Sequence, residues 1–383
     1  MMTAPMGFVD TTIRLAPDTA PMTESTPRQR IRAALRREPS DRTPFAWGFG
    51  LQPSAYRDLD RHLFRWDISA DDYIRRTGDI RKVLPAFVEH DQQADASIWG
   101  YTWREIDYGA GVYREIDRRP LAEARTVADI ERHRWPDPND FRDNAVDMKI
   151  AATDPDDDHA ILLGIFNPFE QLTWMMGMEH ALMTLATEPD VIRAGLRRIT
   201  DFFLDLGNAF LAAAAGRIDI VFLGDDLGTQ SGPMIAPGTY WEVIQPFHAE
   251  LCEMAHRHGA FAMYHTDGAV SEFVDDLIDA GVDCLEAVQV ECPGMAPHDL
   301  KRRFGGELAF HGAVSVQQLL PTATPDAVRQ EVELLAQVLG DGGGYVCAPS
   351  HAIQAGTPPE NVVAMVEAAT GLSVAEIAKN DSE

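Results

Sequence analysis

The sequence predicts an α/β fold, specifically a (β/α)8 TIM barrel, and three observations support this prediction. Eight short apolar runs have the composition of buried strands, and long amphipathic segments lie between most of them. Polar residues follow one expected strand after another, which is typical of the face where barrels hold their active sites. A doubly wound open sheet is the alternative, because a single sequence does not determine the number of strands.

The expected strands are short and rich in β-branched and aromatic residues. In chain order they cover residues 45–49, 96–99, 161–166, 218–223, 261–265, 284–288, 308–311 and 345–348. The expected helices have apolar residues at helical spacing, and several begin at a proline and end before a glycine. They cover residues 26–37, 179–187, 191–215, 237–258, 270–280 and 325–339.

We expect one domain over residues 27–375, between two terminal segments. Residues 1–26 lack periodicity and predict a flexible N-terminal arm, and residues 376–383 predict a C-terminal tail. Residues 100–138 interrupt the alternation of strands and helices in an early connection. Two alternating runs there flank Tyr108-Gly-Ala-Gly111, which predicts an inserted β-hairpin.

The composition limits the partners of this chain. Its 383 residues are 45% apolar, enough for a large core, and its net charge is −27. A surface this acidic repels phosphate backbones and anionic lipid. We therefore expect neither nucleic acid nor a membrane as a partner. No export pattern is seen at the N-terminus, and the four cysteines lack a C-x-x-C spacing. We therefore expect a cytoplasmic enzyme with a small-molecule substrate.

Three residues at expected strand ends form a candidate metal site. His265 and Asp267 end one expected strand, and His351 follows the last one. Two histidines and one carboxylate suit zinc or another divalent metal and leave coordination positions open. The alternative is that His265 and His351 act as general acid and base without a metal, while Asp267 caps the next helix.

Other strand ends provide further candidates. Asp225 and Asp226 are adjacent, so only one can face the mouth, where it would orient the substrate; capping of a turn is the alternative. His311 is a further catalytic candidate, although a buried structural histidine is the usual case. Residues expected to contact the substrate are Asn167, Glu286, Gln289, Trp47 and Phe166.

Three motifs resemble the uroporphyrinogen decarboxylase superfamily, which also contains corrinoid-dependent methyltransferases. They are Tyr264-His-Thr-Asp-Gly268, Phe310-His-Gly-Ala-Val314 and Ala348-Pro-Ser-His-Ala-Ile-Gln354. The resemblance covers roughly residues 26–372. It implies a TIM barrel with its cleft at the carboxyl ends of the strands, and the family suggests a homodimer.

The departures from the family pattern bear on the reaction. The methyltransferases hold zinc with a His-x-Cys pair and a later cysteine, whereas the matching positions here are His265, Asp267 and His351. Nitrogen and oxygen ligands are harder donors than thiolates. A set made of them favours activation of water or a hydroxyl over activation of a thiol. Residues 47–54 also lack the arginines with which the decarboxylases bind the carboxylates of their substrate.

Three functions therefore remain open. The resemblance favours a metal-assisted methyl transfer or O-demethylation, with Zn2+ or another divalent metal on this chain and a corrinoid protein as partner. The second is a metal-free decarboxylase or lyase of a smaller acid, in which Asp225 and His351 handle protons. The third is a tetrapyrrole-binding protein without catalytic activity, although so many converging titratable groups favour an enzyme.

Overall fold

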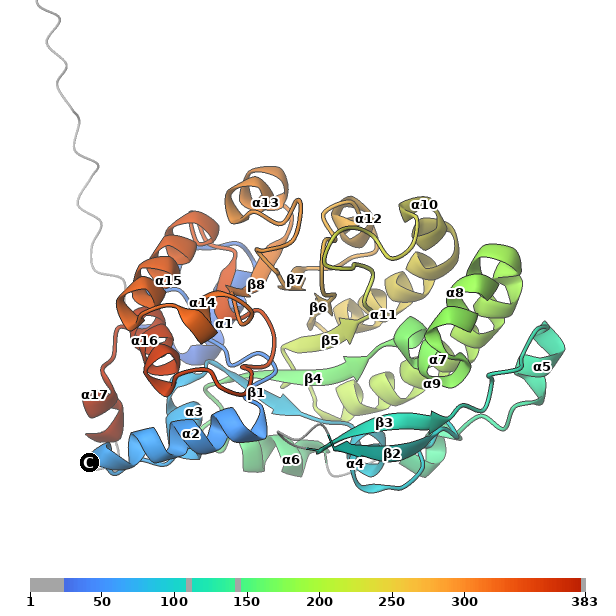
Figure 1. Ribbon diagram of the computed structural model, residues 1–383, viewed down its shortest axis with the longest axis horizontal. Coiled ribbons are helices and arrows are strands. Elements are labelled where there is room, and N and C mark those ends of the chain that lie inside the picture. Colours follow the sequence, from blue (N-terminus) through green and yellow to red (C-terminus); the bar gives the residue numbers. More distant parts are fainter. Residues whose placement is uncertain (1–23, 108–111, 142–145, 380–383) are drawn as a thin grey trace, which may run out of the picture.

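A computed structural model describes residues 24–107, 112–141 and 146–379, and its centre is a curled parallel sheet (Figure 1). The strand order is β1-β4-β5-β6-β7-β8-β9, so neighbours in the sheet follow the order of the chain. The strands are β1 (Ile80–Val83), β4 (Ala160–Phe166), β5 (Ile220–Gly224), β6 (Phe261–His265), β7 (Cys284–Ala287), β8 (Ala309–Val314) and β9 (Tyr345–Pro349). The predicted barrel architecture is confirmed.

The barrel closes through a short eighth segment at residues 44–47. Phe45 forms a parallel bridge to Cys347 of β9, and its carbonyl accepts a hydrogen bond from the amide of Asp79, just before β1. The Asp79 carboxylate, which is 2% exposed, accepts from Arg30, Arg42 and the amide of Phe45. This carboxylate therefore joins the two edges of the sheet.

The second strand differs from the sequence prediction. The strand expected at residues 96–99 is absent, because residues 97–99 form a turn. The strand that lies beside β4 in its place is β1, which was not expected. Arg81 and Lys82 interrupt the apolar pattern of β1, so the segment does not resemble a buried strand. The reason is that the side chain of Lys82 lines a cavity in the barrel instead of the apolar core.

The predicted hairpin is present between β1 and β4. Strands β2 (Thr102–Asp107) and β3 (Val112–Arg118) pair in the antiparallel sense, and the expected turn at residues 108–111 lies outside the described residues. In Figure 1 the hairpin lies below the barrel, near α4 and α7.

Helices surround the sheet in the alternating order of a barrel. The α-helices are α1 (Pro27–Leu35), α2 (Pro53–Leu63), α3 (Ala70–Thr77), α4 (Ala86–Gln93), α5 (Val127–Arg132), α6 (Val146–Thr153), α7 (Pro168–Met176), α8 (Met178–Thr187), α9 (Pro189–Ala213), α10 (Pro237–Thr239), α11 (Gln245–Arg257), α12 (Val274–Asp279), α13 (Pro297–Phe304), α14 (Leu319–Thr322), α15 (Pro325–Leu339), α16 (Pro359–Thr370) and α17 (Val374–Lys379). Three short turns are η1 (Phe64–Trp66), η2 (Pro138–Phe141) and the π-helical η3 (Tyr240–Ile244). The helix expected over residues 237–258 is divided by η3, where Pro246 cannot donate a backbone hydrogen bond.

The structure describes only part of the predicted arm and of the predicted tail. The arm expected at residues 1–26 lies outside the described residues up to residue 23. The tail expected from residue 376 begins as part of α17, in which Ile377 is 1% exposed, and residues 380–383 lie outside the described residues. The packed domain therefore extends at least to Lys379. Within the described ranges, no helix has both the length and the apolar character needed to cross a bilayer.

Side chains inside the barrel are layered along the strands. Near the amino ends, Met263, Cys284 and Ala309 form an apolar layer, which α1 covers with Ile31 and Leu35. Two residues further along the same strands lie His265, Glu286 and His311, in register on β6, β7 and β8. Because residues two apart on a strand face the same side, these three polar side chains form the layer above the apolar one.

Gly312 on β8 should be sensitive to any side chain. Its φ is +111°, and an added Cβ would lie 2.0 Å from the carbonyl oxygen of Ala287 on β7. We expect Gly312→Ala to lower the free energy of unfolding by about 3 kcal/mol, because strain and overlap add. Gly306→Ala is the control, since a Cβ there meets nothing within 4 Å. Urea unfolding measures both, and equal stabilities of the two variants would contradict the prediction.

Candidate active site

The carboxyl ends of β6 and β9 bring the three predicted metal ligands together. His265 is the last residue of β6, Asp267 follows two residues later, and His351 follows β9. One ligand atom from each of the three lies within 4.8 Å of the others. The structure thus places these residues, far apart in sequence, as a group at the mouth of the barrel.

His265 is held in a fixed orientation by Glu286. Its Nδ1 lies 2.5 Å from Oε2 of Glu286, which leaves Nε2 directed toward Asp267 Oδ1 at 4.0 Å and Asp226 Oδ1 at 3.8 Å. Burial alone would lower the pKa of His265, but the charge and hydrogen bond of Glu286, with Asp267 and Asp226, raise it to about 9. The imidazole therefore lies among carboxylates that favour a positive charge at Nε2.

Asp267 and His351 complete the group. Oδ2 of Asp267 lies 3.9 Å from Nε2 of His351, and its buried Oδ1 has no hydrogen-bond partner among the described residues. Burial raises the pKa of the Asp267 carboxyl, while His265 and His351 oppose this rise. The ring of Phe49 stacks on His351 and contacts the edge of His265, with ring centroids 4.8 Å apart in both cases.

The adjacent carboxylates Asp225 and Asp226 point to opposite sides, as expected, but Asp225 is not the one that faces the mouth. It is fully buried, accepts a hydrogen bond of 2.6 Å from His248 Nε2, and caps α7 through the amides of Phe169 and Glu170. The prediction that Asp225 contacts the substrate is therefore wrong, because its oxygens are used within the core. Asp226, with a side chain 36% exposed, faces His265 instead.

Glu170 is a titratable group that the sequence did not single out as a catalytic candidate. It lies in the first turn of α7, and its Oε2 accepts a hydrogen bond of 2.9 Å from Asn167 Nδ2. Burial, with smaller effects of Asp225 and Asp226, raises its pKa to about 7 despite the hydrogen bond of Asn167. A carboxyl with this pKa can both donate and accept a proton near neutral pH.

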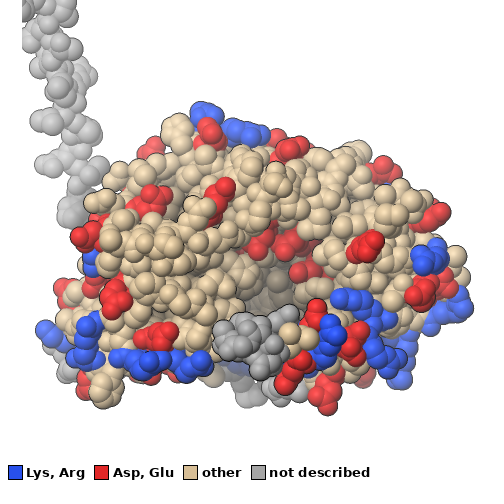
Figure 2. All heavy atoms as spheres, viewed as in Figure 1, with Lys and Arg blue, Asp and Glu red and all other residues tan. Residues whose placement is uncertain are grey.

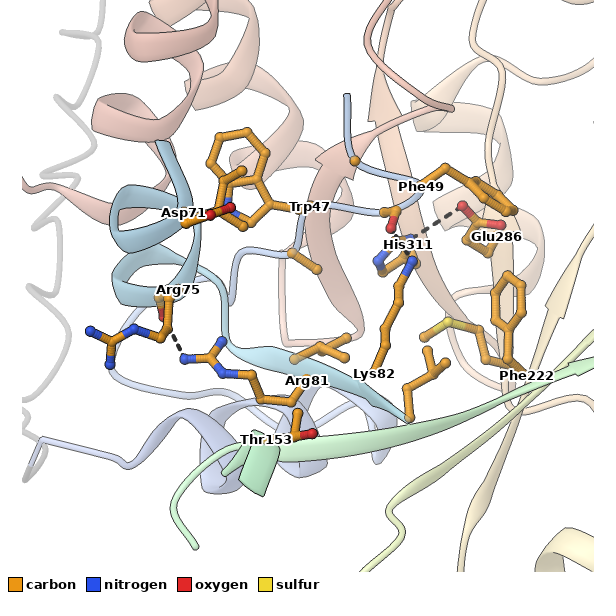
Figure 3. A pocket seen from close by; sticks show the side chains of 17 residues that line it. Trp47, Phe49, Asp71, Arg75, Arg81, Lys82, Thr153, Phe222, Glu286 and His311 are labelled. Carbon is orange, nitrogen blue, oxygen red and sulfur yellow. Dashed lines mark hydrogen bonds and ion pairs between the residues drawn. The ribbon is translucent and has the colours of Figure 1, made fainter. Parts of the chain in front are cut away.

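A cavity of about 440 Å³ lies inside the barrel, beside the group of His265, Asp267 and His351 (Figure 3). Glu286 and His311 line it from β7 and β8, Trp47 from the closing segment, Phe49 from the turn after that segment, and Lys82 from β1. In Figure 3 the side chain of Lys82 extends toward His311. The ammonium donates to the carbonyl of Gly48, and removal of water by the surrounding protein lowers its pKa, although the residue as a whole stays exposed.

Sequence reasoning missed Lys82 because it missed β1. A lysine in an expected loop carries no sign of function. Only the pairing of Lys82 with Leu162 of β4 shows that this side chain lies on a barrel strand.

The space-filling view shows acidic side chains at a hollow in the centre of the face (Figure 2).

The remaining predicted contact residues occupy several positions. Trp47, Glu286 and His311 line the central cavity, and Gln289 lines a smaller one with Asp267 and His351. Burial lowers the pKa of His311 to about 4, so its ring is neutral at pH 7.

Asn167 and Phe166 line neither the central cavity nor the smaller one beside Asp267. Asn167 supports Glu170 through its hydrogen bond and lines a third cavity, beside the hairpin. Phe166 is fully buried against Phe203 of α9, with ring centroids 5.5 Å apart, and does not line any of the three cavities described above. The prediction that Phe166 contacts the substrate is therefore wrong.

The donor set fits a divalent metal. Two imidazoles and a carboxylate converge, and the unpartnered Oδ1 of Asp267 is a buried acceptor for which a cation would compensate. Glu286 fixes His265 through Nδ1, the outer-shell arrangement that metal-binding histidines usually have. Asp154, Asp158 and His159 form another such group before β4, but there His159 already pairs with Asp154 at 2.9 Å.

Comparisons with known proteins agree with this architecture. Residues 106–372 match the family model described as uroporphyrinogen decarboxylase (URO-D). Uroporphyrinogen decarboxylase of Coxiella burnetii is 25% identical over 190 residues, half of either chain, and that of Edwardsiella ictaluri is 36% identical over 103 residues, 27% of either chain.

A solved structure shows the same fold. The methyltransferase from Methanosarcina mazei aligns with a TM-score of 0.63 at 19% identity, over 90% of this chain and 98% of its own. At this identity the likeness concerns the fold alone. Because the family model matches more than half of its residues, the chain belongs to the uroporphyrinogen decarboxylase family.

Proposed function

We propose that this chain is a metal-dependent methyltransferase that acts on a methylated oxygen compound. The observation that carries the proposal is the convergence of His265, Asp267 and His351 on one point, with a buried Asp267 oxygen that lacks a partner. None of the three is a thiolate, and such a set suits the activation of an oxygen better than that of a thiol. A bound divalent metal would act as a Lewis acid on that oxygen.

The residues around this group have separate tasks in the proposed reaction. Glu286 orients His265, and Phe49 covers His265 and His351 on one side, where it excludes water. When the methyl group leaves, the oxygen that carried it gains a pair of electrons and needs a proton. Glu170, with a pKa of about 7, and Asp226 are the groups proposed to hold and deliver this proton.

The methyl acceptor is proposed to be a reduced corrinoid on a separate protein. The resemblance to corrinoid-dependent methyltransferases supports this partner, and the Methanosarcina mazei methyltransferase has the same fold. When bound, such a corrinoid would supply the nucleophile that accepts the methyl group, and both bonding electrons would stay on the oxygen.

A decarboxylase of a smaller acid is the second candidate, and Lys82 is the observation that favours it. Lys82 lines the central cavity together with Arg75 and Arg81, and such cations can bind a carboxylate. In this reaction Glu170 is the group proposed to protonate the carbon from which CO2 leaves. No metal is needed for this reaction.

Methyl transfer to reduced cobalamin, used as a soluble acceptor, tests the proposal. We expect zinc-loaded protein to form methylcobalamin from methyl ethers or methanol, to lose this activity on chelation, and to regain it with Zn2+. The His258→Ala variant, which changes a histidine bonded to Asn208 on the helical side, should behave like the wild type. Full activity of metal-free protein, or release of CO2 from a carboxylic acid without methyl transfer, would contradict the proposal.

A further inference from the structure

We propose that Gln289 is a positioning residue for the candidate metal site, because it fixes the backbone from which Asp267 reaches the metal. This inference rests on the proposed function, in which His265, Asp267 and His351 hold a divalent metal. Gln289 was predicted to contact the substrate, whereas the task proposed for it now acts through Asp267.

The carboxylate of Asp267 is not held by hydrogen bonds of its own within the described part of the chain. Its buried Oδ1 has no partner there, and its Oδ2 lies 3.9 Å from His351 Nε2, beyond hydrogen-bonding distance. A side chain without such bonds keeps its rotamer freedom, so its place depends on the backbone that carries it. Whatever fixes residues 267 and 268 therefore decides whether Asp267 can share a metal with the two histidines.

Two side-chain oxygens accept the backbone amides of this loop. Oδ1 of Asp226 accepts from the amide of Asp267 at 2.9 Å. Oε1 of Gln289 accepts from the amide of Gly268 at 2.8 Å. Gly268 has a φ of +88°, and a Cβ there would lie 2.5 Å from the carbonyl oxygen of Thr229, so the loop turns tightly against its neighbour. The bond to Gln289 thus fixes the turn directly after the metal ligand.

Gln289 is itself held firmly, two residues after the end of β7. It is 4% exposed, and the same Oε1 also accepts from Gln230 Nε2 at 3.2 Å and lies 3.7 Å from the Sγ of Cys292. The preceding Val288 has a φ of +47°, a conformation that β-branched residues adopt only where the surrounding structure requires it. The three donors and the turn at Val288 together fix this oxygen beside the loop.

Contact with the substrate is the other task that Gln289 could have, because it lines the small cavity beside Asp267 and His351. Its acceptor oxygen, however, is already used within the protein. The two tasks are separated by a measurement of metal binding in the absence of substrate. A positioning residue affects zinc affinity under these conditions, and a residue that only contacts substrate does not.

Zinc affinity of the full chain, measured by competition with a zinc-binding dye, tests this inference. Gln289→Met keeps the length and the neutrality of the side chain but removes the acceptor. We expect it to lower the affinity for Zn2+ roughly 10–100-fold, the usual effect of losing a residue that orients a metal ligand. Gln289→Glu keeps an acceptor oxygen and adds negative charge, so it should bind Zn2+ at least as tightly as the wild type.

Gln230→Met is the matched control. It removes a donor to the same oxygen but leaves the bond between Gln289 and Gly268, so it should bind Zn2+ like the wild type. Urea unfolding of the zinc-free proteins follows stability separately. A purely structural role of Gln289 would lower stability and zinc affinity in Gln289→Met and Gln289→Glu alike.

Unchanged zinc affinity in Gln289→Met, or equal losses in Gln289→Met and Gln289→Glu, would overturn the inference. A larger loss in Gln230→Met than in Gln289→Met would do the same. If Gln289→Met failed to fold, Gln289→Asn, which withdraws the acceptor by one methylene group, would take its place with the same expected loss. Absence of zinc binding in the wild type would overturn the proposed function together with this inference, whereas failure in the variants alone would leave the proposed function intact.

Discussion

Replacement of His265 by alanine should abolish both metal binding and methyl transfer. The variant loses one of three ligands at the mouth of the barrel and leaves the buried Glu286 without the partner of its Oε2. Loss of an outer-shell partner already weakens a metal site roughly 10–100-fold, so loss of a ligand should exceed this range. Competition with a zinc-binding dye measures the change in affinity.

Two companion variants make this result decisive. His351→Ala removes the third ligand from a side chain that is 36% exposed, so it tests the site even if His265→Ala folds poorly. His159→Ala removes a histidine from the group at Asp154 and Asp158 and should leave zinc affinity unchanged. Loss of zinc in His159→Ala, with zinc retained in His265→Ala and His351→Ala, would show that zinc binds at Asp154 and Asp158. That result would contradict the proposed site at the mouth of the barrel.

Asp79→Ala should cause the largest loss of stability of any single change proposed here. The carboxylate is buried and holds Arg30, Arg42 and the amide of Phe45 where the barrel closes. Removal leaves the Arg30 guanidinium, from a residue only 4% exposed, with the Asp41 carboxylate alone to balance its charge. Breaking a buried pair in this way costs about 3–5 kcal/mol.

An exposed ion pair is the control for Asp79. Asp58 pairs with Arg61 at 2.7 Å on the surface of α2, and Asp58→Ala should change the free energy of unfolding by at most about 0.5 kcal/mol. Urea unfolding followed by circular dichroism compares the two. If Asp79→Ala were as stable as Asp58→Ala, the Asp79 cluster would not be what closes the barrel.

The sequence allowed the prediction of those parts of the fold in which one periodic pattern dominates. The strands that end at His265 and near His351 are continuous apolar runs, so their ends, and the polar residues there, could be located within a few positions. Strand β1 could not, because Arg81 and Lys82 break its pattern. A lysine directed into a cavity and a lysine in a loop are indistinguishable without the pairing of the strands.

The direction in which each side chain points was harder to predict than the strand end at which the residue lies. Asp225 and Asp226 are chemically identical, and only the position of His248 on α11 shows that Asp225 is the buried one. Phe166 ends β4 as the active-site residues end their own strands, yet it turns outward to Phe203. Glu170 has an unusual pKa mainly because it is buried at the start of α7, with smaller effects of the two aspartates.

X-ray absorption at the zinc edge of zinc-loaded protein reports directly on whether His265, Asp267 and His351 hold the metal. We expect a first shell of nitrogen and oxygen alone, at about 2.0–2.2 Å, with the outer scattering of two imidazoles from His265 and His351. The second imidazole should disappear in His351→Ala. A sulfur ligand at about 2.3 Å, or a zinc shell that His351→Ala does not alter, would contradict the account.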